Sequence, residues 1–199
     1  MTKPYEIVSV ERVFSGFFAV DRAMVKFGLT EGGMSSVHER LSAERGDSAA
    51  VLLHLVEEDA FLFARQFRYP CVAHGNAWML EAVAGRIDSE ETPQAAIRRE
   101  ALEEGGYRLG ELTKVGAFYG SPGGLSELTH VFYAPVSAGD RIREGGGVDV
   151  GEDVEMVSLP TAEAVRMALS GDIRDGKALI ALLWFAASCP TTQSRVGEG

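Results

Sequence analysis

The sequence predicts an α+β fold, and three observations lead to this prediction. Much of the N-terminal half consists of segments rich in Val and Phe in which polar and apolar residues alternate, as they do in half-buried strands. One short helix with clearly marked ends follows, and then come further strands and two C-terminal helices. Because strands and helices do not alternate regularly, the fold is not expected to be built from βαβ units.

The predicted strands fall into groups that are separated by turn residues. They are residues 5–29 (two or three strands around Gly16), residues 46–70 (a hairpin that turns at Glu57-Glu58-Asp59), residues 77–87 (one strand that ends at Gly85), residues 114–136 (two strands interrupted by Ser-Pro-Gly-Gly) and the end of residues 143–160, after a loop rich in glycine and acidic residues. The strands of the first 45 residues are expected to form a small separate sheet.

The first predicted helix starts at Thr92-Pro93, where a hydroxyl can cap the helix and proline suits its first position. Gly105-Gly106 is a typical helix end. Its expected buried face is made of Ala95, Ala96, Ala101 and Leu102. Two more helices are predicted over residues 161–171 and 175–188.

Composition narrows the classes of function. The chain has 199 residues, of which 46% are hydrophobic, enough for one core with or without a small accessory lobe. A formal net charge of −10 argues against nucleic acid as a partner and gives no reason to expect a membrane surface. No signal peptide is evident, and the longest apolar run, residues 178–188, is too short to cross a bilayer. With only two cysteines, Cys71 and Cys189, a cytoplasmic location is expected.

Three glutamates are crowded onto the first predicted helix. Glu103 and Glu104 lie three and four positions after Glu100, so all three project from one side. Hard divalent cations take oxygen ligands, and one or two carboxylates together with substrate phosphates form a usual Mg²⁺ site. The alternative is a solvated acidic face that Arg98 and Arg99 balance.

The spacing around these glutamates resembles the Nudix box. Gly85, Glu91 and then residues 99–107, Arg-Glu-Ala-Leu-Glu-Glu-Gly-Gly-Tyr, fill all seven fixed positions of that motif over 23 residues. Ala101 departs mildly from it, since a larger aliphatic residue is usual there. The resemblance implies an α/β/α Nudix sandwich with a mixed central sheet, an enzyme that hydrolyses a nucleoside diphosphate linked to another group, and Mg²⁺ or Mn²⁺ as cofactor.

The same resemblance implies roles for residues of the box. Glu100 and Glu104 would be direct metal ligands, together with the backbone carbonyl of Ala84. Glu103 would hold a metal or its water. Glu91 would pair with Arg99 and brace the loop and the helix, a supporting role.

Segments outside the box resemble the Nudix branch of ADP-ribose pyrophosphatases and the related GDP-mannose hydrolase. These are residues 64–70, 80–88, 120–127 and 151–159. The match implies that Arg68 binds the substrate diphosphate, for which a guanidinium fork is well suited. Arg65 in the same segment and Glu127, just after the Ser-Pro-Gly-Gly turn, are further candidates for substrate binding.

The catalytic base is less closely defined by the resemblance. In this branch it tends to lie on an acidic loop before the strand that matches residues 152–157. That loop offers Asp149, Glu152 and Asp153; Glu152 is favoured and Asp149 comes next. Glu103, within the box, is a competing base.

The expected reaction is hydrolysis of a nucleoside diphosphate sugar, with ADP-ribose, giving AMP and ribose 5-phosphate, as the first substrate. GDP-mannose or another nucleotide sugar is the alternative, followed by a non-catalytic sensor of nucleotide sugars. Because relatives form homodimers through N-terminal strands, residues 1–45 are expected to serve dimerisation. Residues 46–190 would form the Nudix domain and residues 191–199 a loose tail.

Overall fold

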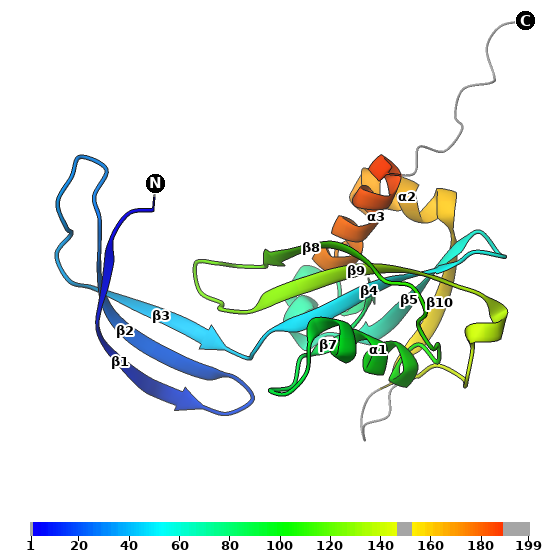
Figure 1. Ribbon diagram of the computed structural model, residues 1–199, viewed down its shortest axis with the longest axis horizontal. Coiled ribbons are helices and arrows are strands. Elements are labelled where there is room, and N and C mark those ends of the chain that lie inside the picture. The colour runs from blue at the N-terminus through cyan, green and yellow to red at the C-terminus, as the bar shows by residue number, and fades with distance from the viewer. Residues whose placement is uncertain (1, 147–152, 189–199) are drawn as a thin grey trace, which may run out of the picture. The chain divides into compact units, whose positions relative to one another are not determined.

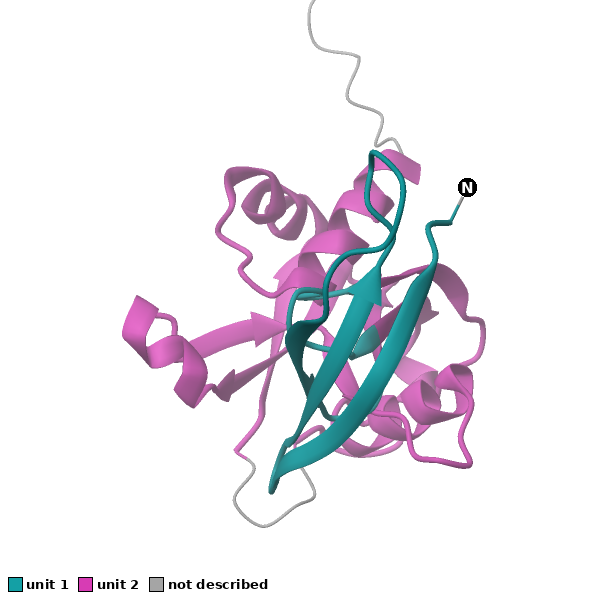
Figure 2. Cartoon of the chain, turned by 90° about the vertical axis from the view of Figure 1, so that its left-hand side faces the viewer, with its two compact units in different colours: residues 1–47, 119–128 teal, residues 48–118, 129–199 magenta. Residues whose placement is uncertain are grey.

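A computed structural model of the chain describes residues 2–146 and 153–188. The chain divides into two compact units (Figure 2). Unit 1 comprises residues 1–47 and 119–128, and unit 2 comprises residues 48–118 and 129–199.

Unit 1 is built on a three-stranded antiparallel sheet in the order β1-β2-β3. The strands are β1 (Tyr5–Ser15), β2 (Ala19–Phe27) and β3 (His38–Glu44). The predicted connection of two strands around Gly16 is confirmed, and the Gly16 amide donates to the Phe18 carbonyl across 2.8 Å. All eleven residues of β1 are exposed, among them several large apolar ones.

Unit 2 contains a mixed sheet with its strands in the order β10-β5-β4-β9-β8. Their bounds are β4 (Ser48–Leu55), β5 (Ala60–Phe67), β8 (Thr113–Tyr119), β9 (Leu128–Val136) and β10 (Glu155–Pro160). β4 pairs antiparallel with β5 and parallel with β9, so the sheet is mixed. The predicted hairpin of residues 46–70 is confirmed as β4 and β5.

The sheet forks between β4 and β5. β6 (Trp78–Glu81) pairs with β5, whereas β7 (Val83–Arg86) pairs with β4. The prediction of one continuous strand here was wrong, because Ala82 separates two short strands with different partners. The Ala82 amide donates to Asp175 Oδ2 across 3.1 Å instead of to a neighbouring strand, which explains the break.

Helices cover both faces of the sheet (Figure 1). α1 (Pro93–Glu103) lies on one face, and α2 (Thr161–Ser170) and α3 (Gly176–Ser188) lie on the other. Two short 3₁₀ helices, η1 (Tyr69–His74) and η2 (Ala138–Asp140), lie in connections. This layered arrangement confirms the predicted α+β sandwich. No helix in the described ranges is long and apolar enough to cross a membrane.

The predicted ends of α1 are confirmed. Thr92 Oγ1 accepts a hydrogen bond from the Ala95 amide across 3.2 Å. Gly106 has a φ of +78°, a conformation that favours glycine after a helix.

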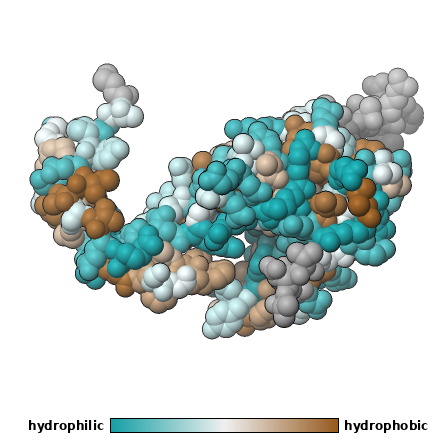
Figure 3. Space-filling model, turned by 60° about the horizontal axis from the view of Figure 1, so that its bottom comes forward, coloured by the Kyte–Doolittle hydropathy of each residue, from teal (hydrophilic) through white to brown (hydrophobic). Residues whose placement is uncertain are grey.

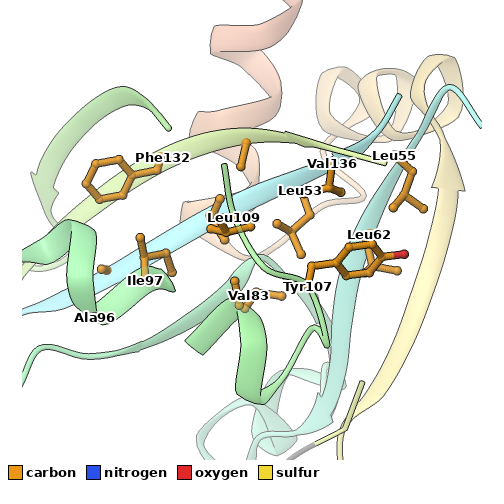
Figure 4. Packing of buried hydrophobic residues seen from close by; sticks show 14 of the residues in the cluster. Leu53, Leu55, Leu62, Val83, Ala96, Ile97, Tyr107, Leu109, Phe132 and Val136 are labelled. Atoms are coloured by element: carbon orange, nitrogen blue, oxygen red, sulfur yellow. The ribbon is translucent and has the colours of Figure 1, made fainter. Parts of the chain in front are cut away.

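The inner face of α1 differs in part from the prediction. Ala96, Ile97 and Ala101 are buried, Leu102 is half-buried and Ala95 is exposed. Ile97 fills the inner face because it packs into a core made with strand residues such as Leu53, Val83 and Phe132 (Figure 4). This core fixes the helix that carries the glutamates.

Candidate active site

Glu100 packs against the backbone of Gly85. A Cβ atom placed on Gly85 would lie 2.5 Å from Glu100 Cγ and would overlap its carboxylate. Gly85 is in β7 and Glu100 is in α1, so the missing side chain lets the helix present this carboxylate directly at the strand. This close approach explains why the motif places a glycine fifteen positions before the glutamate.

Arg99 is the centre of the site's hydrogen bonding. Its Nε and Nη2 atoms donate to the two carboxylate oxygens of Glu91 across 3.0 and 2.9 Å. Nη2 also donates to the Arg86 carbonyl, and Nη1 donates to Glu100 Oε1 across 2.7 Å and to Glu103 Oε2 across 3.2 Å. The predicted pairing of Glu91 with Arg99 is therefore confirmed, and the same guanidinium also links two more glutamates.

Charge pairing shifts the pKa values of Glu91 and of Arg99 itself. The side-chain hydrogen bond from Arg99 holds the pKa of Glu91 below its ordinary value. The hydrogen bond to Glu91 and those to Glu100 and Glu103 raise the pKa of Arg99 against the opposing effect of burial. This pair is therefore charged at neutral pH, and the arginine offsets the repulsion among the glutamates.

Glu103 and Glu104 end the helix in different environments. Glu103 is half-buried, whereas Glu104 is 9% exposed and forms the C-terminal cap residue of α1. The described residues contain no group of three His, Cys, Asp or Glu side chains already arranged around a cation position. The donor set nevertheless fits a hard divalent cation, because carboxylates and a backbone carbonyl supply only oxygen ligands.

Arg68 is held by a carboxylate that sequence reasoning missed. Its Nε and Nη2 atoms donate to the two oxygens of Glu81 across 2.6 and 3.1 Å, a bidentate pair. The side chain of Glu81 is only 6% exposed. Burial lowers the pKa of Arg68, but Glu81, with smaller contributions from Glu104 and Asp175, outweighs it and raises the pKa.

Lys177 extends this pair into a network of four charges. Its Nζ atom lies 3.4 Å from Glu81 Oε2 and 2.7 Å from Asp175 Oδ1. Asp175 also accepts hydrogen bonds from the Ala82 and Ala178 amides, both across 3.1 Å. The network joins the start of α3 to the fork in the sheet. Only the Asp-Gly-Lys triplet before an apolar helix could have indicated it in the sequence.

A protein-family model described as the NUDIX domain matches residues 44–180. The chain belongs to the NUDIX family. The match spans the whole box and the charge network at the fork. The chain is therefore a Nudix hydrolase, as the resemblance of its sequence implied.

Three relatives of this Nudix hydrolase match between 76% and 94% of its chain. It is 41% identical over 153 residues to the GDP-mannose pyrophosphatase of Citrobacter koseri, a match that spans 76% of the chain and 79% of the relative. The protein of the same name from Klebsiella pneumoniae is 39% identical over 181 residues, 89% of the chain and 90% of the relative. The protein from Escherichia coli K12 is 35% identical over 191 residues, 94% and 98% of the two chains.

A solved structure supports the fold. The crystal structure of an ADP compounds hydrolase matches with a TM-score of 0.70 and 22% identity, over 98% of this chain and 99% of that one. Both chains therefore share the Nudix architecture.

The other residues predicted to bind substrate or to act as the catalytic base belong to different parts of the chain. Arg65 of β5 pairs with Glu155 of β10, with Nη1 3.2 Å from Oε2, at an exposed position. Glu127 belongs to unit 1, whereas the glutamates of α1 belong to unit 2, so its role stays a prediction. Asp149 and Glu152 lie outside the described residues.

Proposed function

We propose that this Nudix chain hydrolyses the pyrophosphate bond of a nucleoside diphosphate sugar with the help of Mg²⁺ or Mn²⁺. The observation that supports this most strongly is the complete box, in which Glu100 is seated against Gly85 and Arg99 ties Glu91, Glu100 and Glu103 together. A non-catalytic sensor is less favoured, because the box glutamates are all present.

Glu100, Glu104 and the carbonyl of Ala84 would hold the cation, with Glu103 binding a metal or its water. When bound, the cation would neutralise charge on the phosphate oxygens and acidify the attacking water. Arg99 would keep Glu100 and Glu103 in position, and Glu91 would in turn fix Arg99.

Arg68 would orient the diphosphate. Glu81 accepts hydrogen bonds from the Nε and Nη2 atoms of the Arg68 guanidinium. We expect the remaining Nη1 atom to donate to a phosphate oxygen. Arg65 and Glu127 would contact the substrate further from the reacting phosphorus. Arg65 would have to leave or share Glu155 to do so.

The catalytic base would be Glu152, with Asp149 second and Glu103 as the competitor within the box. Glu152→Gln, Asp149→Asn and Glu103→Gln variants separate the three. The base is the residue whose amide variant loses the acidic limb of the kcat/KM profile and reduces kcat by about a hundredfold or more. A Glu152→Gln variant with an unchanged profile would remove it from consideration.

GDP-mannose now replaces ADP-ribose as the first proposed substrate, because relatives 35–41% identical are named GDP-mannose pyrophosphatase. The products would be GMP and a mannose phosphate. ADP-ribose is the second candidate, since residues 80–87 and 178–185 resemble the ADP-ribose enzymes.

The test is a panel of GDP-mannose, ADP-ribose, ADP-glucose and NADH, each incubated with the protein and Mg²⁺ while nucleoside monophosphate is measured. We expect the highest kcat/KM with GDP-mannose. Higher turnover of ADP-ribose would reverse the substrate order, and no turnover of any compound would refute hydrolysis of nucleotide sugars. Glu104→Gln should lose turnover, whereas Glu163→Gln on the exposed side of α2 is the matched control.

We further propose that the chain forms a homodimer through residues 1–45, with residues 46–190 as the catalytic domain and residues 191–199 as a tail. The support is the apolar surface of unit 1, where Ile7, Val10 and Phe14 of β1 are exposed (Figure 3). Such a sheet has too little core of its own. A Val10→Lys, Phe14→Lys double variant should be monomeric by light scattering, unlike Glu31→Lys. A monomeric wild-type protein would refute the dimer.

The cytoplasm is the proposed location. Cys71 is a free, half-buried thiol in the described part of the chain, which suits a reducing compartment. Detection in a cell fraction other than the cytosol would contradict this proposal.

A further inference from the structure

Negative charge accumulates at the C-terminal end of α1. The last carbonyls of a helix lack partners within the helix, and the helix dipole is negative at this end. Glu100, Glu103 and Glu104 add negative charge there, and the last turn of α1 contains no basic residue. Arg99 offsets part of the carboxylate charge, and a second cation close to these carbonyls would stabilise the helix end further.

Arg143 supplies this cation from 40 positions further along the chain. Its Nε atom donates to the Leu102 carbonyl across 3.0 Å, and its Nη2 atom donates to the Glu103 carbonyl across 2.6 Å. The Gly146 amide donates to the Glu104 carbonyl across 2.8 Å. The carbonyls of three consecutive residues at the end of the helix are thus bound by one short segment.

Two glycines permit this close approach. A Cβ atom on Gly145 would lie 2.8 Å from the Glu104 carbonyl oxygen and 2.6 Å from Met156 Cγ. A Cβ atom on Gly106 would overlap the Arg143 carbonyl. The Gly106 carbonyl also accepts a hydrogen bond from the Ile142 amide across 2.8 Å. The docking of residues 141–146 on the helix end is therefore a built contact with no room for side chains at these two glycines.

We infer that Arg143 is a positioning residue for the divalent cation: its guanidinium fixes the backbone of Leu102 and Glu103 and so sets where Glu103 and Glu104 present their carboxylates. This inference rests on the proposed metal site. The hydrogen bonds of the exposed Arg143 side chain go to backbone oxygens of α1, so it acts through the glutamates and does not contact the cation.

The forked shape of the Arg143 guanidinium contributes to binding the helix-end carbonyls, as its charge does. One arginine reaches two successive carbonyls at once, whereas a lysine ammonium is a point charge on a flexible stem. Arg143→Lys keeps the charge and loses the fork, and Arg143→Met removes both. Arg141→Met is the matched control, because Arg141 lies in the same segment and its side chain pairs with Glu144 rather than with the helix.

The experiment is a titration of each full-length variant with Mn²⁺, followed by electron paramagnetic resonance of the bound ion without substrate. We expect Arg143→Met to weaken Mn²⁺ binding by about tenfold and to broaden the bound spectrum. Arg143→Lys should lie between this variant and the wild type, and Arg141→Met should match the wild type. Circular dichroism and thermal unfolding check that each variant is folded; if Arg143→Met does not fold, Arg143→Lys carries the test.

Wild-type affinity and spectrum in Arg143→Met, or in Arg143→Lys where Arg143→Met does not fold, would overturn the inference. Equal losses in Arg143→Met and Arg141→Met would overturn it too, since only net charge would then matter. Glu104→Gln tests the metal site separately from the role of Arg143. If Glu104→Gln binds Mn²⁺ as the wild type does, the metal site itself is refuted and the role of Arg143 with it.

Discussion

The carboxylate of Glu100 occupies the space that a side chain on Gly85 would need. Because Gly85 is in β7 and Glu100 is in α1, this one contact sets how closely the helix approaches the strand. A side chain at position 85 would therefore change where α1 holds this carboxylate.

Gly85→Ala should displace Glu100 from β7. A shift of about 1 Å in a reacting group can reduce turnover by about a hundredfold, so we expect a loss of that size in kcat/KM with Mg²⁺ and weaker Mn²⁺ binding. Gly116→Ala in β8 is the control, because a Cβ atom placed there would have no neighbouring atom within 4 Å. Wild-type turnover in Gly85→Ala would show that the contact has no part in catalysis.

Arg99→Lys should destabilise the folded protein and should also reduce its turnover. Lysine cannot replace hydrogen bonds to Glu91, Glu100 and Glu103 at once, and we expect the free energy of unfolding to fall by about 1–3 kcal/mol. Arg166→Lys provides a comparison, since its pair with Glu163 is exposed and should matter by less than about 1 kcal/mol. Urea denaturation measures both, and equal effects would contradict a special role for Arg99.

Glu81→Gln should lower the free energy of unfolding far more than Glu155→Gln does. Both glutamates lie on strands and pair with an arginine, but the side chain of Glu81 is 6% exposed and that of Glu155 is 63% exposed. Removing the buried charge leaves Arg68 and Lys177 without their shared partner, at a cost of about 3–5 kcal/mol. The exposed variant should lose less than about 1 kcal/mol. Denaturation curves of the two variants test this contrast.

His54 should make stability depend on pH. Burial lowers its pKa below the ordinary 6.5, while Asp59 opposes this, and its Nδ1 atom lies 2.7 Å from the Tyr133 hydroxyl. The unfolded chain therefore takes up a proton at a higher pH than the folded protein does. The free energy of unfolding should fall as pH drops below about 6.5 and continue to fall until the folded-state pKa is reached.

His54→Gln should remove this part of the pH dependence, so its free energy of unfolding should vary less than that of the wild type as pH falls below about 6.5. His74→Gln, at an exposed position in η1, should keep the wild-type slope. Thermal unfolding at a series of pH values measures both variants. An unaltered slope in His54→Gln would assign the pH dependence to other groups.

Local signals in the sequence were enough to predict the local structure in and around the Nudix box. The caps at Thr92 and Gly106, the strand hairpins and the pairing of Glu91 with Arg99 all depend on residues within a short stretch of chain. The inner face of α1 was less predictable, because Ile97 replaces Ala95 there through contacts with distant strands.

Contacts between distant segments were not predictable. Glu81 and Lys177 are 96 positions apart, and neither belongs to a spacing that one sequence reveals. The break at Ala82 depends on Asp175, which no strand pattern announces. Arg143 likewise reads as an ordinary loop cation until its guanidinium is seen on the carbonyls of α1.

β4 is bonded to β5, β7 and β9, and its parallel pairing with β9 joins Ser48 to Thr129, 81 positions later. α1 lies inside that interval, so its inner face is complete only after β9 has docked. Closing so long an interval is entropically costly, and sheets with such distant partners fold slowly. During synthesis, α1 can therefore pack on β4 and β7 early, but the part of its core that β9 supplies, including Phe132, becomes available only once the chain has emerged as far as Val136.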